Sequence, residues 1–123
     1  AMTVRYASAG HPPALWLDRD GKLKKELKRT GIPLGVKPDT QYTVSEDLTL
    51  ERGDLLALMT DGVEESTAED GELFGKERIV QTLGSHQVES AEEIVAGLHG
   101  AGRSHEAANH QPDDFTTIVL KVD

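Results

Sequence analysis

The feature that most constrains this chain is an apolar run, residues 55–59, that is followed at once by Thr60-Asp61-Gly62. A continuous apolar run of this length is typical of a strand that is covered on both faces. Asp-Gly is a common turn dipeptide, so the pattern predicts that Asp61 lies where a buried strand ends in a turn. At such a position the carboxylate is either an ordinary turn residue or an oxygen ligand for a cation.

A second acidic pair, Asp113-Asp114, stands directly before another strand-like run, residues 115–122. If the two strands are neighbours in one sheet, this pair and Asp61 come together at one sheet end. Carboxylate oxygens are the ligands that hard divalent cations such as Mg²⁺ and Mn²⁺ prefer. The spacing therefore indicates either a cation site or two unrelated turns, and it does not by itself choose between them.

The rest of the chain predicts an α+β domain of antiparallel strands and two helices. Short runs at residues 3–7, 14–18 and 41–45 favour further strands. One helix is expected from Lys76 to about Gly84. A second helix should open with a capping box, in which Ser90 and Glu93 satisfy free backbone groups. Strands, then helices, then a final strand is an α+β order.

Composition limits the class of protein. A chain of 123 residues with 37% hydrophobic content fits one globular domain. It contains no cysteine, which excludes disulfides and zinc-thiolate sites and is compatible with the cytoplasm, the default location. No stretch is long and apolar enough for a membrane span, so no membrane partner is expected. The net charge of −9 argues against nucleic-acid binding.

One short segment is basic although the chain as a whole has a negative net charge. The five members of this basic cluster, interrupted by Glu26, are Lys22, Lys24, Lys25, Lys28 and Arg29. The cluster is interpreted as the solvated edge of a hairpin that turns at Asp20-Gly21. The alternative is a docking strip for an acidic or phosphorylated partner.

Six short motifs occur along the chain in a fixed order. They are Ala9-Gly10-His11-Pro12-Pro13, Gly31-Ile32-Pro33-Leu34-Gly35, Gly53-Asp54-Leu55-Leu56, Thr60-Asp61-Gly62-Val63-Glu64-Glu65, Phe74-Gly75 and Asp113-Asp114-Phe115-Thr116. In this order they resemble the C-terminal half of the metal-dependent protein serine/threonine phosphatases (protein phosphatase 2C-like), in their bacterial branch related to stage II sporulation protein E. The resemblance covers almost the whole chain and implies part of a β-sandwich flanked by helices.

The resemblance also implies a function. The expected reaction is hydrolysis of phosphoserine or phosphothreonine on a signalling protein, commonly an anti-anti-sigma factor, by a water that two Mn²⁺ or Mg²⁺ ions activate. Asp61 and Asp113 would be metal ligands, and Gly62 and Asp114 would support the site. Independently of the resemblance, His11 is interpreted as a structural residue whose side chain satisfies the turn of its proline-rich corner, and a site-supporting role is the alternative.

This chain lacks one motif of the family, and the lack changes what activity is expected of it. The family's first metal motif, a Gly-Asp-x-x-Gly-His-Gly type segment in the N-terminal half, has no counterpart in residues 1–123. These residues are therefore expected to form a single partial domain, inactive alone and prone to self-association through uncovered strand edges. The alternative is a noncatalytic, phosphatase-like module that binds proteins.

Overall fold

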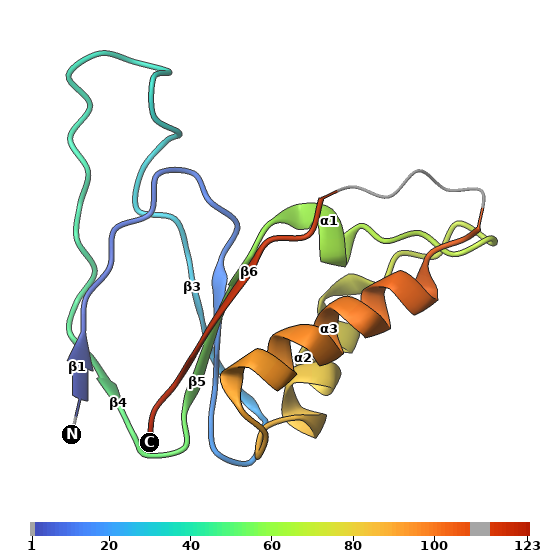
Figure 1. Ribbon diagram of the computed structural model, residues 1–123. Coiled ribbons are helices and arrows are strands. Elements are labelled where there is room, and N and C mark those ends of the chain that lie inside the picture. The colour runs from blue at the N-terminus through green and yellow to red at the C-terminus, as the bar shows by residue number, and fades with distance from the viewer. Residues whose placement is uncertain (1, 109–113) are drawn as a thin grey trace.

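The computed structural model describes residues 2–108 and 114–123. Within these ranges the chain forms six strands and three helices (Figure 1). In chain order they are β1 (Met2–Val4), β2 (Ala14–Leu17), β3 (Leu23–Leu27), β4 (Leu48–Leu50), β5 (Leu55–Met59), α1 (Asp61–Glu64), α2 (Gly75–Ser85), α3 (Ala91–His105) and β6 (Thr117–Lys121). The predicted α+β class is confirmed, with α1 as a short helix where the sequence predicted only a turn.

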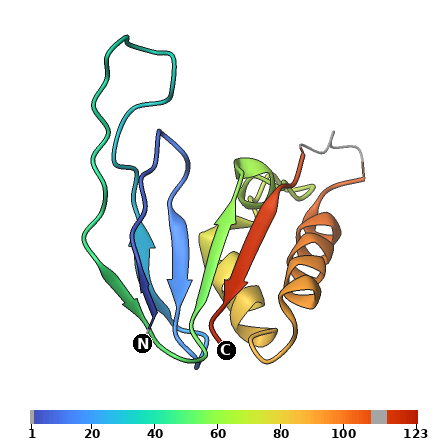
Figure 2. The same ribbon diagram turned by 60° about the vertical axis from the view of Figure 1, so that its left-hand side comes forward.

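Two antiparallel sheets build the fold. Four strands form the larger sheet in the order β3-β2-β5-β6, and β1 pairs with β4 in the smaller one. Figure 2 shows the larger sheet between the β1–β4 pair on one side and helices α2 and α3 on the other. The arrangement is a sandwich of two sheets with helices on the outer face of the larger sheet.

Strand β5 is covered on both faces, as its continuous apolar sequence predicts. Successive side chains of a strand point to opposite faces. Leu55, Ala57 and Met59 belong to the cluster that packs under the helices, and Leu56 belongs to the cluster between the sheets. The helix-side cluster also contains Leu15, Leu17, Val63, Phe74, Ile79, Leu83, Ile94 and Leu98, and the second cluster contains Ala14, Trp16, Leu27, Leu48 and Leu50.

The two long helices form where the sequence places them. Helix α2 ends at Ser85, one residue beyond the expected stop. Helix α3 has the predicted capping box, because the Ser90 hydroxyl accepts from the Glu93 N–H and the Glu93 carboxylate accepts from the Ser90 N–H. Among the described residues, no helix is long and apolar enough to cross a membrane.

The basic cluster lies on and beside β3, an edge strand of the larger sheet that forms a hairpin with β2. Lys24 and Lys25 are in the strand, Lys22 precedes it, and Lys28 and Arg29 follow it. Lys24 contacts Asp54 at 3.4 Å and Lys25 contacts Glu46 at 3.0 Å. Lysine on an edge strand discourages pairing with the edge of another molecule. The expected solvated hairpin edge is therefore confirmed.

The strand predicted at residues 41–45 is wrong. These residues lie in an irregular arm, residues 31–46, that projects beyond both sheets (Figure 1). The Tyr42 ring packs on Gly31 so closely that a Cβ there would be 2.5 Å from Tyr42 Cδ1. The Thr43 hydroxyl donates to the Thr30 carbonyl at 3.2 Å. These side chains fold the arm back on its own base, and the strand begins later, at Leu48.

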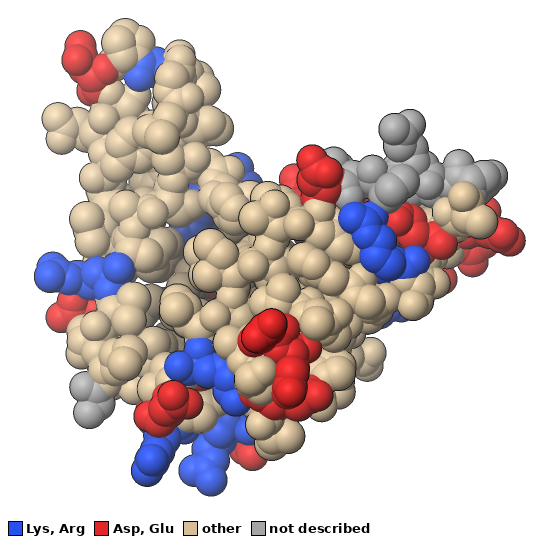
Figure 3. Space-filling model, viewed as in Figure 1, with Lys and Arg blue, Asp and Glu red and all other residues tan. Residues whose placement is uncertain are grey.

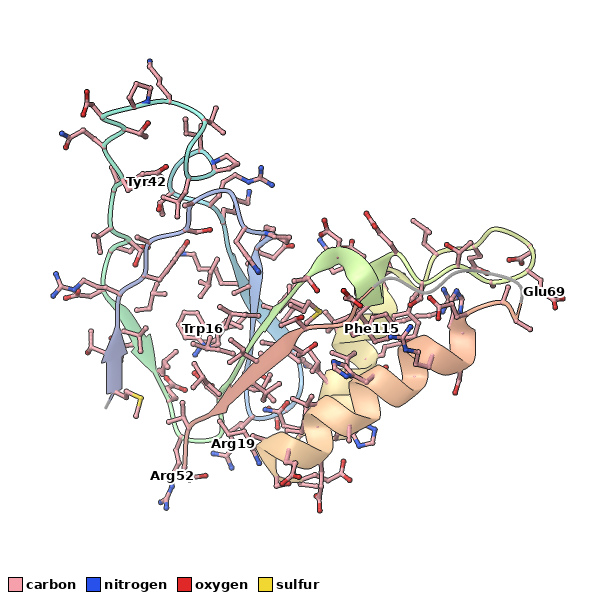
Figure 4. The ribbon with its side chains drawn as sticks, turned by 45° about the horizontal axis from the view of Figure 1, so that its top comes forward. Trp16, Arg19, Tyr42, Arg52, Glu69 and Phe115 are labelled. Atoms are coloured by element: carbon pink, nitrogen blue, oxygen red, sulfur yellow. The ribbon has the colours of Figure 1, made fainter. Side chains whose placement is uncertain are left out.

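A buried carboxylate ties the two sheets together. Asp54 is 1% exposed and accepts hydrogen bonds from the Trp16 indole and from the Glu51 backbone N–H, each at 2.9 Å. Trp16 lies between the two sheets (Figure 4), and the Lys24 ammonium group is 4.7 Å from its ring centroid. Burial raises the pKa of Asp54, but these hydrogen bonds and the Lys24 charge outweigh it, so the pKa lies below its ordinary value.

Candidate functional site

The end of β5 and the beginning of β6 lie side by side. The two strands are antiparallel, and Met59 is opposite Thr117. Beyond this pair, the Thr60 N–H donates to the Thr116 carbonyl at 3.0 Å, and the Thr116 N–H donates to the Thr60 hydroxyl at 3.2 Å. The contact continues past the last residues of the ladder, so the chain around Asp61 stays against the chain around Asp114.

Gly62 makes the closest contact between these two segments. A Cβ at this position would lie 2.2 Å from the Asp114 carbonyl oxygen and 3.1 Å from Cδ1 of Phe115. No other residue type fits without a shift of the backbone, because real Cβ atoms do not approach an oxygen so closely. Gly62 therefore supports the site by allowing a close approach of two backbones.

Asp61 is the first residue of α1, and its side chain is exposed. The helix is fixed beneath it, because Val63 is fully buried and the Ser66 hydroxyl donates to the Gly62 carbonyl at 3.2 Å. Figure 1 shows α1 beside the beginning of β6. The carboxylate of Asp61 thus stands on a rigid base at one end of the larger sheet.

Asp114 is also exposed at this end of the sheet, whereas Asp113 lies outside the described residues. Among the residues that the structure describes, no three His, Cys, Asp or Glu side chains are grouped closely enough to hold a metal ion. Asp61 and Asp114 are nevertheless hard oxygen donors of the kind that Mg²⁺ and Mn²⁺ use. Two carboxylates are too few ligands for such a cation, so a metal site here would need further ligands from outside the described residues.

A pocket of about 130 Å³ opens beside Asp61. Its lining residues are Pro12, Pro13, Leu15, Glu26, Met59, Thr60, Asp61, Glu64, Lys76 and Ile79. Strand β3 and helix α2 each contribute one charged side chain to it, and helix α1 contributes two. The Lys76 ammonium group contacts Glu26 at 3.1 Å across the pocket lining.

His11 lies apart from this pocket. Its side chain is exposed, and Nδ1 is 2.9 Å from the Pro12 carbonyl oxygen. It lines a different and mainly apolar pocket of about 420 Å³, together with residues such as Tyr6 and Leu58. Its neighbours Pro12 and Pro13 form the wall of the Asp61 pocket, so His11 is one residue removed from it.

Helix α3 fixes the segment that follows Asp114, although none of the six sequence motifs includes a residue of this helix. His99 Nε2 is 2.9 Å from the Thr117 hydroxyl oxygen, and its ring meets the Phe115 ring edge-on at 5.4 Å between centroids. The Arg103 guanidinium lies over the Phe115 ring, 3.9 Å from its centroid. Figure 4 shows Phe115 between the start of β6 and α3. The i, i+4 spacing of His99 and Arg103 is the sequence pattern that places both on one helix face.

The pKa of His99 lies below its ordinary value for two reasons. Burial disfavours the charged imidazolium, and the nearby positive charge of Arg103 disfavours it further. The neutral ring is therefore the form that supports the segment after Asp114.

Known proteins resemble this chain along most of its length. The sequence profile for stage II sporulation protein E (SpoIIE) matches residues 1–123. The chain is 33% identical over 117 residues to phosphoserine phosphatase RsbU of Bacillus subtilis, covering 94% of this chain and 34% of that protein. It is 31% identical over 117 residues to protein IcfG of Synechocystis sp., covering 95% of this chain and 18% of that protein.

Solved structures show the same fold. The SiaA-PP2C domain of Pseudomonas aeruginosa superposes with a TM-score of 0.79 at 23% identity, covering 98% of this chain and 47% of that one. The structure of the PP2C phosphatase domain of SpoIIE from Bacillus subtilis, with a fragment of its regulatory domain, gives a TM-score of 0.76 at 20% identity, covering 98% and 34%.

The fold is therefore that of part of a PP2C phosphatase domain. Within that class, the chain belongs to the stage II sporulation protein E family. It spans about a third or less of the length of the curated relatives named above.

Proposed function

We propose that this chain is part of a Mn²⁺- or Mg²⁺-dependent protein phosphatase that removes phosphate from phosphoserine or phosphothreonine. The observation that carries the proposal is the contact of Gly62 with Asp114, which brings two acidic segments together beside a pocket. Relatives named as phosphoserine phosphatases, RsbU and RsbP of Bacillus subtilis at 33% and 32% identity, support the same reaction.

In this proposal Asp61 and Asp113 hold the cations, and ligands outside residues 1–123 complete the site. When bound there, such cations would supply positive charge that lowers the pKa of a water molecule and offsets the charge on the phosphoryl group. Residues of this chain supply the rigid frame. Gly62 permits the close approach of the two segments, and Asp114 orients the neighbouring strand or a water molecule.

The expected substrate is a phosphorylated signalling protein in the cytoplasm, such as an anti-anti-sigma factor. The substrate assignment is tested with the full natural protein and a serine-phosphorylated anti-anti-sigma protein from the same genome. We expect loss of about 80 Da from the intact substrate by mass spectrometry, dependent on Mn²⁺ and stopped by a chelator. Retention of the phosphate on this substrate, with rapid hydrolysis of an aryl phosphate, would contradict the substrate class and leave the phosphatase reaction standing.

A second candidate function is that of a noncatalytic module that binds phosphoproteins. The observation that favours it is the incomplete donor set, since the described residues contain no group of three metal-ligating side chains. Under this alternative the full natural protein binds the phosphorylated partner in Mn²⁺ and never releases phosphate. A time course of phosphate release at a protein concentration that saturates binding separates the two functions.

A further inference from the structure

Lys76 is the one cation that lines the pocket beside Asp61 among the described residues. The same pocket is lined by three carboxylates, those of Glu26, Asp61 and Glu64. A phosphoryl group carries negative charge, so these carboxylates repel it. Lys76 is the side chain of this lining that attracts it.

The position of Lys76 in its helix gives an independent reason to look for a ligand. Lys76 is the second residue of α2, which runs over Gly75–Ser85. The N-terminus of a helix carries partial positive charge, so a lysine in the first turn is electrostatically unfavourable for the helix. The pairing with Glu26 on β3, at 3.1 Å, offsets that effect in the absence of substrate.

The ion pair between Lys76 and Glu26 is accessible enough for another anion to replace Glu26. The side chains of Lys76 and Glu26 are 48% and 29% exposed, and the ammonium group sits at the end of a flexible stem. A phosphoryl oxygen that enters the pocket therefore competes with the Glu26 carboxylate for the same ammonium group. Charge-assisted hydrogen bonds to phosphate are among the stronger ones in proteins.

We propose that Lys76 binds the phosphoryl group of the substrate and that Glu26 holds the ammonium group at the pocket until substrate enters. The proposal rests on the proposed phosphatase function for the nature of the substrate. The role of Lys76 itself does not depend on that function. A measurement of phosphate binding, without any measurement of turnover, tests it.

The competing explanation is that the ion pair merely clamps α2 to β3. The two explanations predict different relations between two substitutions. If the pair is a clamp, Lys76→Met and Glu26→Gln both loosen the pocket and both weaken phosphate binding. If Lys76 is the phosphate ligand, Lys76→Met weakens binding, whereas Glu26→Gln releases the lysine and strengthens it.

The experiment measures binding of inorganic phosphate to the full natural protein in Mn²⁺ by isothermal titration calorimetry. We expect Lys76→Met to raise the Kd by about tenfold, because a charge-assisted contact is lost. Lys76→Arg keeps the Kd within about threefold, since a guanidinium also binds phosphate. Glu26→Gln lowers the Kd by about two- to threefold, as expected for loss of a partly exposed competing pair.

A matched control comes from the same region. Lys25 is 48% exposed, as Lys76 is, and pairs with Glu46 at 3.0 Å, but it does not line the pocket. Lys25→Met should therefore leave the Kd unchanged. The steady-state constants for an aryl phosphate give a second measurement, in which Lys76→Met lowers kcat/KM by about the same factor and Lys25→Met leaves it unchanged.

The proposal is overturned if Lys76→Met binds phosphate as tightly as the parent protein, if both substitutions shift the Kd in the same direction, or if the parent protein binds no phosphate. Phosphate binding with the predicted opposite shifts, but without turnover of any phosphoester, would uphold the role of Lys76 and reject the phosphatase function.

Discussion

Gly62 lies directly against the backbone carbonyl of Asp114, with room for a hydrogen atom but not for a methyl group. The contact joins two segments that are more than fifty positions apart in the chain and that each carry one of the acidic motifs found in the sequence. Neighbouring hydrogen bonds between Thr60 and Thr116 hold the same two segments. The geometry of the candidate site thus depends on the absence of a side chain at one position.

Gly62→Ala should destabilise the fold by about 1–3 kcal/mol, the usual cost of forcing a methyl group into a packed site. The measurement is urea unfolding followed by circular dichroism. Gly100→Ala is the control, because Gly100 lies in α3 with nothing within 4 Å of a built Cβ. That control should gain about 0.5–1 kcal/mol from helix propensity. Equal free energies of unfolding for the two variants would refute the close contact.

Asp54 should make stability depend on acid pH. Its pKa in the folded state lies below the ordinary value of 3.8, because the hydrogen bonds and the Lys24 charge outweigh burial, which acts in the opposite direction. The carboxylate therefore contributes stability that is fully present above the unfolded-state pKa and is lost as the pH falls through the folded-state pKa. Urea unfolding between pH 6 and pH 2 measures the loss.

Asp54→Asn should remove this part of the pH dependence and lower stability at neutral pH by about 1–3 kcal/mol, since a charged acceptor for the Trp16 and Glu51 donors is replaced. Asp20 is an exposed aspartate in the β2–β3 turn, so Asp20→Asn serves as the control and should change little. An Asp54→Asn variant with the stability and pH profile of the parent would contradict the account.

His99 should add a pH dependence in a different range. Its folded-state pKa is lowered from the ordinary value of 6.5 by burial and by Arg103, so the folded state binds fewer protons than the unfolded state. Stability should fall as the pH drops from above 6.5 toward the folded-state pKa. His99→Gln keeps a polar group near Thr117 and should flatten the curve in this range. A slope that survives the substitution would assign the effect to another group.

The exposed edge of the larger sheet predicts self-association. Strand β6 is an edge strand, and Ile118 and Leu120 on it are 56% and 53% exposed. Unpaired strand edges with exposed apolar side chains favour contacts between chains. Sedimentation velocity at high concentration should detect dimers or larger species of residues 1–123, and Leu120→Lys should reduce them.

The control for this effect is Val88→Lys, because Val88 is 93% exposed but lies in the turn after α2 rather than on a strand. That substitution should leave association unchanged. A monodisperse monomer at the highest concentration reached would argue that the edge is already protected.

Acidic and basic side chains are interspersed over the face in Figure 3, and the projecting arm is largely uncharged there. Two lysines of the β3 hairpin are paired with carboxylates of other segments, Lys24 with Asp54 and Lys25 with Glu46.

Much of the fold was predictable because strong local patterns coincide with the tertiary structure. The apolar sequence of β5 favours cover on both faces, and the capping box of α3 is a local signature of a helix start. The strand predicted at residues 41–45 failed because Tyr42 and Thr43 use their side chains within the arm. Strand β3 is polar because it is an edge, so its composition resembles that of a loop.

The candidate site was predictable in part for the same reason. Asp61 and Asp114 each follow or precede an apolar strand, and this local pattern places them at a sheet end. The pairing of Lys76 with Glu26 joins residues fifty positions apart, and no local pattern reveals it. The contact of Phe115 with His99 likewise depends on how α3 packs over β6.

The most direct test of the central claim is Mn²⁺-dependent hydrolysis of an aryl phosphate by the full natural protein, compared between Asp61→Asn and Asp70→Asn. Asp70-Gly71 is a second Asp-Gly pair in the same region, and Asp70 is exposed in a loop where its carboxylate accepts from the Glu72 N–H at 2.9 Å. We predict metal-dependent turnover that Asp61→Asn abolishes, by about a thousandfold or more, and that Asp70→Asn leaves intact. Turnover that survives Asp61→Asn, or falls equally in both variants, would contradict a catalytic metal site at the end of β5.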